Sequence, residues 1–451
     1  MNAPAVRVTT PPMRSGVEKT RFLPAGSWCL YDFANTIYSG VVVTLAFQLH
    51  LAELTGKEKY AFWTLSAGLI ASGLAVPACG AIADRTGQSK RYLIFTTAAC
   101  CVCTIAMSAT INWPILLVLY FITTFAYNTS LVFYESLVVQ IAERRHVGRV
   151  TGLGVGLGYL GTAFALPIAL WACKFLKAQG RGIVFNGQIL FFGPAFVVAG
   201  LLFLIFSIPL IIWVPERRVE NEQPLSMTVV GDGFGRLLRT LRNLPANRNV
   251  MFFLLANFFC LDTVNALIAC FMPFVKKGLG LTTDRAALYM ILFSVIALGT
   301  GMATGWMADR WGSKRVLAAS MLAFLVTLLS CAWTSSEIVF AVMFLGLGTF
   351  ALAGTWTAGR KLLVTLAPPD EIGEYFGLYG ITAKLSIVGN FLFGWIADMK
   401  FGAEDSTSYR VALSCLLFSL LIGMALLTRV KVKDSARDIE GADGAVEEKK
   451  G

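Results

Sequence analysis

Four charged side chains interrupt long apolar stretches of the chain, and groups of their types can bind a charged solute or carry a proton. They are Asp32, Glu135, Asp262 and Lys384. An ionised group inside an apolar segment is costly, so such residues usually pair with one another or line a path for a solute or ion. We therefore treat all four as candidates for a polar binding site.

Both aspartates begin the same short pattern. Asp32 is followed three residues later by Asn35, and Asp262 is followed by Asn265. Because residues i and i+3 share a helix face, each pair would present a carboxylate and an amide together. The two pairs are 230 residues apart, which leaves their equivalence in the fold open. With two further polar groups at similar depth, the candidate solute and proton site contains Asp32, Asn35, Asn128, Glu135, Asp262, Asn265, Trp356 and Lys384.

Three of the charged candidates also have a purely structural interpretation. Asp32 could cap a break in its helix, and Glu135 could pair with Arg144 or Arg145 below it. Lys384 could extend along its four-carbon stem to the membrane surface. These alternatives stay open on the sequence alone.

Depth within the apolar segments suggests two functional pairs. Asp262 lies about 12 residues, or ~18 Å, inside its segment, too deep to reach water except through a cavity. Asp262 and Lys384 are expected either to pair or to bind opposite ends of a zwitterion. Asp32 and Glu135 each lie roughly 8 Å from the same end of their segments. Two carboxylates at one level repel each other, so one of them is expected to hold a proton.

The elements that must position these residues are apolar helices. Apolar residues make up 56% of the chain and charged residues 14%, with a mean hydropathy of +0.67, whereas soluble proteins have about 45–50% and about 25%. A helix that crosses the hydrocarbon of a bilayer needs about 20 residues. We predict an all-α membrane protein with twelve transmembrane helices at 27–53, 60–83, 92–111, 114–140, 149–172, 189–213, 249–275, 285–307, 316–333, 336–359, 374–397 and 409–428.

The twelve segments divide six and six around a polar stretch. We predict a disordered cytoplasmic N-terminus at 1–26, a six-helix bundle at 27–213, a cytoplasmic linker at 214–248, a second six-helix bundle at 249–430 and a disordered cytoplasmic tail at 431–451. Basic residues at helical spacing in the linker predict an amphipathic helix at 233–244. The tail is rich in charged residues and has almost nothing to bury, which is typical of disorder.

The distribution of basic residues predicts the topology. The chain has a net charge of +11 and 38 Lys and Arg residues. These lie between the apolar segments and not on one face of a fold, so no nucleic-acid partner is expected. Placing the N-terminus in the cytoplasm puts 27 of them inside and 10 outside. Because cytoplasmic loops are enriched in Lys and Arg, both termini are predicted to be cytoplasmic, with the lipid bilayer around the helices.

The sequence offers little for catalysis or metal binding. Most of the ten cysteines lie inside apolar segments, where Cys behaves as a small hydrophobic residue. The cysteines at 100–103 lack a second ligand pair, and His50 and His146 are distant in sequence, so no zinc site is expected. The glycines at 231–235 lack the Lys and Ser or Thr of a phosphate-binding loop. We predict no metal, no cofactor and no enzymatic activity.

Two patterns repeat at one offset, which indicates a duplicated chain. Ala-Asp-Arg-x-Gly occurs at 83–87 and again at 308–312, 225 residues later. An aliphatic residue and Ala followed by two glycines occur at 141–152 and at 366–377 with the same offset. Duplicated halves with a solute site between them are typical of secondary transporters. The repeated loops are candidate gates and contain Asp84, Arg85, Gly87, Asp309, Arg310 and Gly312.

The loop Gly-Ala-Ile-Ala-Asp-Arg-Thr-Gly-Gln-Ser-Lys-Arg at 80–91 resembles the signature loop of the major facilitator superfamily. Three further motifs resemble the vacuole-effluxer-like branch, which includes the autophagy-related amino-acid effluxers of fungi. They are Leu-Tyr-Asp-Phe-Ala-Asn at 30–35, Gly-Arg-Val-Thr-Gly-Leu-Gly at 148–154 and Tyr-Phe-Gly-Leu-Tyr-Gly at 375–380. The resemblance implies the major facilitator fold, two six-helix bundles with segments 1, 4, 7 and 10 around a central cavity.

These observations predict a monomeric secondary transporter that moves a small polar solute by alternating access, coupled to protons. The branch resemblance implies an amino acid or related metabolite and efflux. Because the long insertions of the fungal proteins are missing, a bacterial inner membrane is expected. A membrane enzyme would need a nucleophile or metal cluster that the sequence lacks. A non-transporting receptor or assembly scaffold on the same fold is the alternative.

Overall fold

The computed structural model describes residues 22–432, apart from residues 87, 142–146, 180–182, 186–187, 191, 217–230, 232, 236–237, 240, 243, 368–371 and 400–404. Within the described residues, twelve helical stretches are long and apolar enough to cross a membrane. The expected all-α fold with twelve transmembrane helices is therefore confirmed, with the addition of one short hairpin.

The first half of the chain supplies six of the twelve crossings. The first crossing combines α1 (Phe22–Ile37), a wider π-helical stretch η1 (Tyr38–Ala46) and α2 (Phe47–Thr55). The next five are α3 (Lys59–Thr86), α4 (Ser89–Ala106) with the short turn η2 (Met107–Ala109), α5 (Trp113–Ile141), α6 (Val147–Ala178) and α7 (Gly193–Trp213).

A short antiparallel hairpin between α6 and α7 was not expected from the sequence. It pairs β1 (Ile183–Phe185) with β2 (Gln188–Leu190). The Asn-Gly sequence between the strands favours a two-residue hairpin connection. The sixth crossing consequently begins at Gly193 and not at residue 189.

The second half supplies the other six crossings after the short turn η3 (Leu244–Ala246). They are α9 (Arg248–Pro273) with η4 (Phe274–Gly278), α10 (Thr283–Trp311), α11 (Ser313–Trp333), then α12 (Glu337–Val342) continued by η5 (Met343–Gly348) and α13 (Thr349–Leu366), the broken pair α14 (Ile372–Leu385) and α15 (Val388–Ala397), and α16 (Asp405–Thr428). The linker helix expected at 233–244 falls largely outside the described residues.

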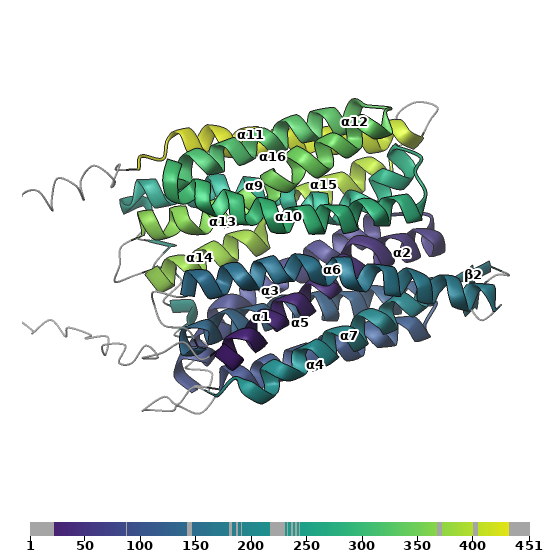
Figure 1. Ribbon diagram of the computed structural model, residues 1–451, viewed down its shortest axis with the longest axis horizontal. Helices are drawn as coiled ribbons and strands as arrows, with labels where there is room; N and C mark the ends of the chain where they lie inside the picture. The colour runs from purple at the N-terminus through teal and green to yellow at the C-terminus, as the bar shows by residue number, and fades with distance from the viewer. Residues whose placement is uncertain are drawn as a thin grey trace, which may run out of the picture.

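The two halves lie side by side with their helices roughly parallel, the purple to teal half below the green to yellow half in Figure 1. They pack against each other through α6 with α10 and through α3 with α14 and α15. We call the end where α1 begins and α16 ends the proximal end. The opposite end, at α2 and α12, is the distal end (Figure 1).

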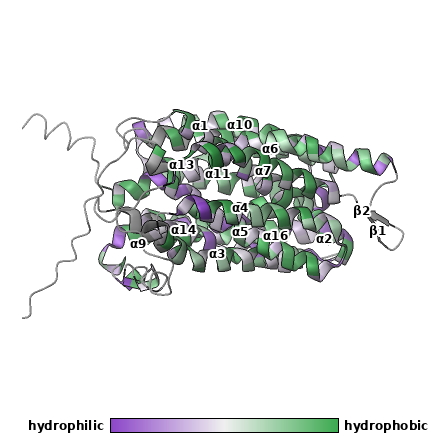
Figure 2. Cartoon of the chain, turned by 90° about the horizontal axis from the view of Figure 1, so that it is seen from below, coloured by the Kyte–Doolittle hydropathy of each residue, from purple (hydrophilic) through white to green (hydrophobic). Residues whose placement is uncertain are grey.

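The outer surface of the helices is apolar, as a bilayer requires. Phe95, Met302 and Phe418 are each at least 70% exposed, on three different helices. Figure 2 shows hydrophobic residues along most of the length of the bundle, with hydrophilic residues concentrated toward its ends. A soluble protein rarely leaves so much apolar surface open to water.

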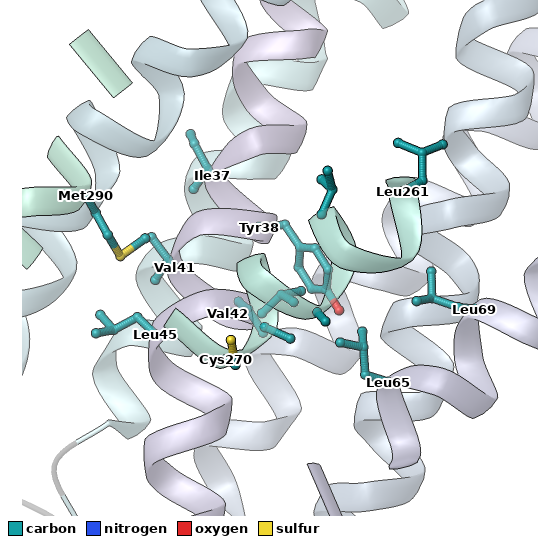
Figure 3. Close-up of a cluster of buried hydrophobic side chains, with 14 of the residues drawn as sticks. Ile37, Tyr38, Val41, Val42, Leu45, Leu65, Leu69, Leu261, Cys270 and Met290 are labelled. Atoms are coloured by element: carbon teal, nitrogen blue, oxygen red, sulfur yellow. The ribbon is translucent and has the colours of Figure 1, made fainter. Parts of the chain in front are cut away.

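An apolar cluster joins the two halves on the distal side of the molecule, and we call it the distal plug. Val41 and Leu45 of η1 meet Leu65 of α3, Cys270 of α9 and Met290 of α10 in one buried group (Figure 3). The elements α2 and η1 of the first half also pack against α9 of the second. The distal part of the interface is therefore closed by side chains from both halves.

Candidate functional site

A reciprocal contact between α1 and α5 holds the acidic part of the site. The indole of Trp28 donates to the carbonyl oxygen of Tyr134 at 3.0 Å, and the Tyr134 hydroxyl donates to the carbonyl oxygen of Trp28 at 3.2 Å. Their rings stack with centroids 4.3 Å apart. Asp32 follows Trp28 by about one helical turn, and Glu135 follows Tyr134 directly. The contact thus brings the two carboxylates close enough to interact electrostatically.

Asp32 lies in space left by glycines of α6. Its Oδ1 accepts a hydrogen bond from Asn35 Nδ2 at 2.9 Å, so the i and i+3 pair forms within α1. A Cβ on Gly154 would lie 3.3 Å from Asp32 Oδ2, and a Cβ on Gly158 would lie 3.5 Å from the Asp32 carbonyl oxygen. Asn35 is buried, whereas Asp32 remains partly exposed. Small residues on α6 let α1 approach closely and leave the carboxylate accessible.

Glu135 faces the second half of the molecule. It is exposed on α5 and interacts electrostatically with Arg360 of α13 and with Lys384 of α14. The alternative partners Arg144 and Arg145 lie outside the described residues. Glu135 is therefore positioned between two bases that belong to the other half.

Arg360 belongs to this charged region, although sequence reasoning places it in a cytoplasmic loop. The tenth crossing continues to Leu366, so Arg360 is still helical. Its guanidinium lies over the Trp356 ring at 6.0 Å and interacts with Asp32 as well as with Glu135. The spacing of four residues from Trp356, on one helix face, is the sequence signal that could have identified it.

The four accessible charges are divided by sign between the halves. The acids Asp32 and Glu135 belong to the first half, and the bases Arg360 and Lys384 belong to the second. Each is partly or fully exposed. Tyr159 of α6 interacts electrostatically with both Asp32 and Arg360, which brings a hydroxyl into the same region. The arrangement presents a negative and a positive surface to each other on the proximal side of the distal plug.

The eleventh crossing is broken, and Asn265 of α9 supports the break. The helix α14 ends at Leu385 and α15 begins at Val388, so backbone groups between them lose their helical partners. Asn265 Nδ2 donates to the carbonyl oxygens of Ala383 and Ser386, each at 3.0 Å. Freed backbone groups in a bilayer need partners from the protein. Asn265 supplies one such partner.

Asp262 caps the other side of the break. Its Oδ1 accepts from the Gly389 amide at 2.8 Å, and its Oδ2 accepts from the Ser419 hydroxyl at 2.8 Å. The side chain is buried, and no ion pair joins it to Lys384 among the described residues. The expected Asp262 and Lys384 pair is not formed, because both carboxylate oxygens of Asp262 already accept hydrogen bonds at the break.

Asn128 and the metal-ligating residue types add little to the charged region. Asn128 Nδ2 donates to the Thr124 carbonyl oxygen of its own helix at 2.9 Å. Within the part of the chain that the structure describes, no three His, Cys, Asp or Glu side chains come together as metal ligands. All ten cysteines are free thiols.

Comparison with known proteins identifies the fold that carries this site. The chain matches the Major Facilitator Superfamily over residues 26–383 and 254–447. It belongs to this superfamily. It is therefore a multi-pass membrane transporter and not an enzyme.

Relatives support both the superfamily and the predicted branch. The MFS-type transporter YxiO of Bacillus subtilis is 27% identical over 91% of this chain and 95% of its own. Autophagy-related protein 22 of Yarrowia lipolytica is 22% identical over 67% of this chain and 54% of its own. Among solved structures, a D-xylose-proton symporter covers 91% of this chain and 99% of its own with a TM-score of 0.68 at 16% identity, which shows the shared fold.

The superfamily signature loops lie at the proximal end and are described in part. Asp309 forms an ion pair with Lys361 at the end of α13, and the Arg310 guanidinium lies over the Trp306 ring at 5.3 Å. Gly312 adopts a φ of +90°, which favours glycine at this turn. In the first loop, the side chains of Asp84 and Arg85 and all of Gly87 lie outside the described residues.

The distal end carries ion pairs between the halves. Lys277 of η4 lies 2.8 Å from the Glu58 carboxylate, and the Glu58 amide donates to Asp398 at 3.2 Å. Lys174 of α6 pairs with Asp284 of α10 at 2.7 Å. Burial raises the pKa of Glu58, and the nearby Lys277 only partly offsets this effect. These contacts reinforce the closure made by the distal plug.

Proposed function

We propose that this superfamily member transports a small zwitterionic solute, an amino acid or a related metabolite, in exchange for or together with protons. The observation that carries this proposal is the opposition of charges across the halves. Asp32 and Glu135 offer carboxylates to an ammonium group, whereas Arg360 and Lys384 offer cations to a carboxylate. A solute with both groups would satisfy both sides at once, whereas a neutral sugar would leave all four charges unmatched.

Alternating access in this proposal depends on where the halves touch. The distal plug and the Glu58 to Lys277 ion pair close the distal end, while the charged residues on the proximal side remain accessible. We infer that the conformation is open toward the proximal end. The excess of Lys and Arg at the proximal end favours the cytoplasm on that side, so the transporter would be open inward.

Proton coupling follows from competition for one cation. Arg360 interacts with Glu135 when no solute is bound. A solute carboxylate that binds Arg360 would withdraw this positive charge from Glu135, and Glu135 would then take up a proton more readily. Solute binding and proton binding would in this way favour each other.

The proposed setting is a bacterial inner membrane with both termini in the cytoplasm. The bacterial relative that matches nearly the full length supports this setting. We further propose that the chain acts as a monomer, because all four charges of the site come from one chain. The resemblance to the effluxer-like branch favours export as the physiological direction.

Transport by reconstituted protein tests this proposal. Proteoliposomes containing the purified chain should accumulate at least one labelled amino acid when a pH gradient is imposed, and collapse of the gradient should stop accumulation. Arg429→Gln, a change at an arginine whose guanidinium lies over the Phe252 ring at the end of α16, is a control that should transport normally. Absence of transport for all amino acids, sugars and organic acids would favour the receptor or scaffold alternative.

A further inference from the structure

The repeat of 225 residues assigns a second-half counterpart to each member of the acidic site. Asp32 of α1 corresponds to Asn257 of α9, and Glu135 of α5 corresponds to Arg360 of α13. A neutral amide thus stands where the first half has a carboxylate, and a base stands where it has a second acid. The second half carries an image of the first-half site with its charge inverted.

Local packing agrees with this correspondence. A Cβ on Gly154 of α6 would lie 3.5 Å from the hydroxyl of Tyr134 on α5. At the corresponding positions the two residue types are exchanged, because Gly359 stands on α13 and Tyr379 on α14. A Cβ on Gly359 would lie 3.2 Å from the Tyr379 hydroxyl and 3.4 Å from Asn257 Oδ1. The same tyrosine and glycine contact therefore occurs beside both sites.

The second-half image differs in that its polar groups lack partners. Asn257 is 1% exposed and Tyr379 is 5% exposed, yet neither amide atom of Asn257 nor the Tyr379 hydroxyl has a hydrogen-bond partner among the described residues. In the first half, the hydroxyl of Tyr134 has a partner. Buried polar groups in folded proteins are almost always hydrogen-bonded. These two groups are therefore available to a ligand.

The unpartnered groups lie beside the cation of the same half. Gly359, which approaches both of them, directly precedes Arg360. Tyr379 interacts electrostatically with Arg360, and its ring is held by stacking on Phe253 with centroids 6.3 Å apart. The guanidinium, the phenol and the amide come from three different helices and converge on one location.

We propose that Arg360, Tyr379 and Asn257 form a carboxylate-binding subsite in the second half, with the missing Cβ of Gly359 leaving room for the ligand. A guanidinium binds a carboxylate through two parallel hydrogen bonds. The phenol O–H and the amide NH₂ add neutral donors, since the amide can present either atom by turning over. The subsite rests on the proposed transport function, because it binds the acidic end of the same solute.

Binding to the purified full-length chain tests the subsite without requiring transport. Thermal-shift titrations compare the twenty amino acids with their carboxamides, and include lactate and succinate as carboxylates without an amine. The wild-type chain should be stabilised by one or more members with a free carboxylate. Conversion of that member to its carboxamide should weaken binding by about tenfold or more, because a hydrogen-bonded charge pair is lost.

Three single substitutions separate the subsite from general structure. Tyr379→Phe removes only the hydroxyl, Asn257→Leu removes both amide atoms, and Gly359→Ala fills the space between them. Each should weaken binding of the carboxylate by about tenfold and leave binding of the carboxamide unchanged. Gly380→Ala is the matched control on α14, because its Cβ would meet nothing within 4 Å.

Three results would overturn the subsite. One is that no carboxylate in the panel stabilises the wild-type chain. Another is that the substitutions weaken carboxylates and carboxamides equally. The third is that Gly359→Ala raises thermal stability with unchanged binding, as expected if ordered water fills the space. Transport of a neutral solute with no carboxylate binding would remove the subsite but keep the transporter, whereas carboxylate-dependent binding without transport would keep the subsite and remove the proposed function.

Discussion

The two Asp-x-x-Asn patterns share a sequence and differ in their structural roles. In α1, Asp32 bonds to its own Asn35 and keeps a partly exposed carboxylate. In α9, Asp262 and Asn265 point to a neighbouring broken helix and bond to its backbone. A shared helix face predicts that two side chains lie together, and says nothing about what that face meets.

The neighbours explain the difference between the two patterns. Asp32 packs against Gly154 and Gly158 of α6, which offer space and no polar side chain. Asp262 packs against the gap between α14 and α15, where a free amide is available. The repeat therefore matches Asp32 with Asn257, five residues before Asp262.

The largest effect is expected from breaking the Asp262 contacts. Asp262→Ala leaves the Gly389 amide and the Ser419 hydroxyl without an acceptor in the apolar interior, and should destabilise the protein by about 3 kcal/mol. Asp32→Ala is the matched substitution in the other pattern and should change stability by less than about 1 kcal/mol. Thermal unfolding followed by intrinsic fluorescence measures both. Equal losses of stability would show that the two patterns have the same structural role.

The next largest effect is expected from the bases and acids that face each other across the halves. Arg360→Gln should lower the rate of solute uptake about a hundredfold and leave thermal stability nearly unchanged, because the side chain is partly exposed. Adding Glu135→Gln should lower uptake by much less than the product of the two single effects, since the partners act together. Independent effects of the two substitutions would mean that Glu135 and Arg360 do not cooperate.

A smaller and more selective effect is expected from the two acids of the first half. Asp32→Asn and Glu135→Gln are compared for uptake driven by a pH gradient and for exchange of solute at equal pH. The residue that carries the proton should lose gradient-driven uptake roughly tenfold and retain exchange. If both modes fall together for both variants, the acids bind solute or support structure and do not couple protons.

The smallest effect is expected at the distal end, where Glu58 is buried beside Lys277. Burial raises the pKa of Glu58 in the closed state, so the closed state binds the proton more tightly than an open, hydrated state would. Lowering the pH through the interval between the usual glutamate value and the raised value should favour closure, and raising the pH should weaken it.

Spin-label distances across the distal end between pH 4 and 8 measure this dependence. The Glu58→Gln variant should stay closed throughout, because a neutral amide carries no charge to desolvate. The Asp284→Asn variant removes an exposed ion pair at the same end and should retain the pH dependence of the wild type. Opening of the distal end as the pH falls would contradict the assignment.

Much of the fold could be predicted from the sequence because a bilayer constrains it strongly. Apolar runs of about 20 residues must be helices, since lipid offers no hydrogen bonds to an open backbone. The repeated Ala-Asp-Arg-x-Gly loops also predicted the duplicated architecture. The hairpin at 183–190 and the break after Leu385 were missed because each is short and leaves the apolar pattern almost unchanged.

The sequence by itself determined the number of crossings, the superfamily and the presence of charges inside the membrane. Only the tertiary structure decided which of those charges face one another. Arg360 resembled a loop residue until α13 was seen to continue past it, and Asp262 resembled a cavity residue until its acceptors met the Gly389 amide. The physical reason is that periodicity fixes a side chain's direction on its own helix, whereas its hydrogen-bond partners come from neighbouring helices, whose positions depend on the packing of the whole chain.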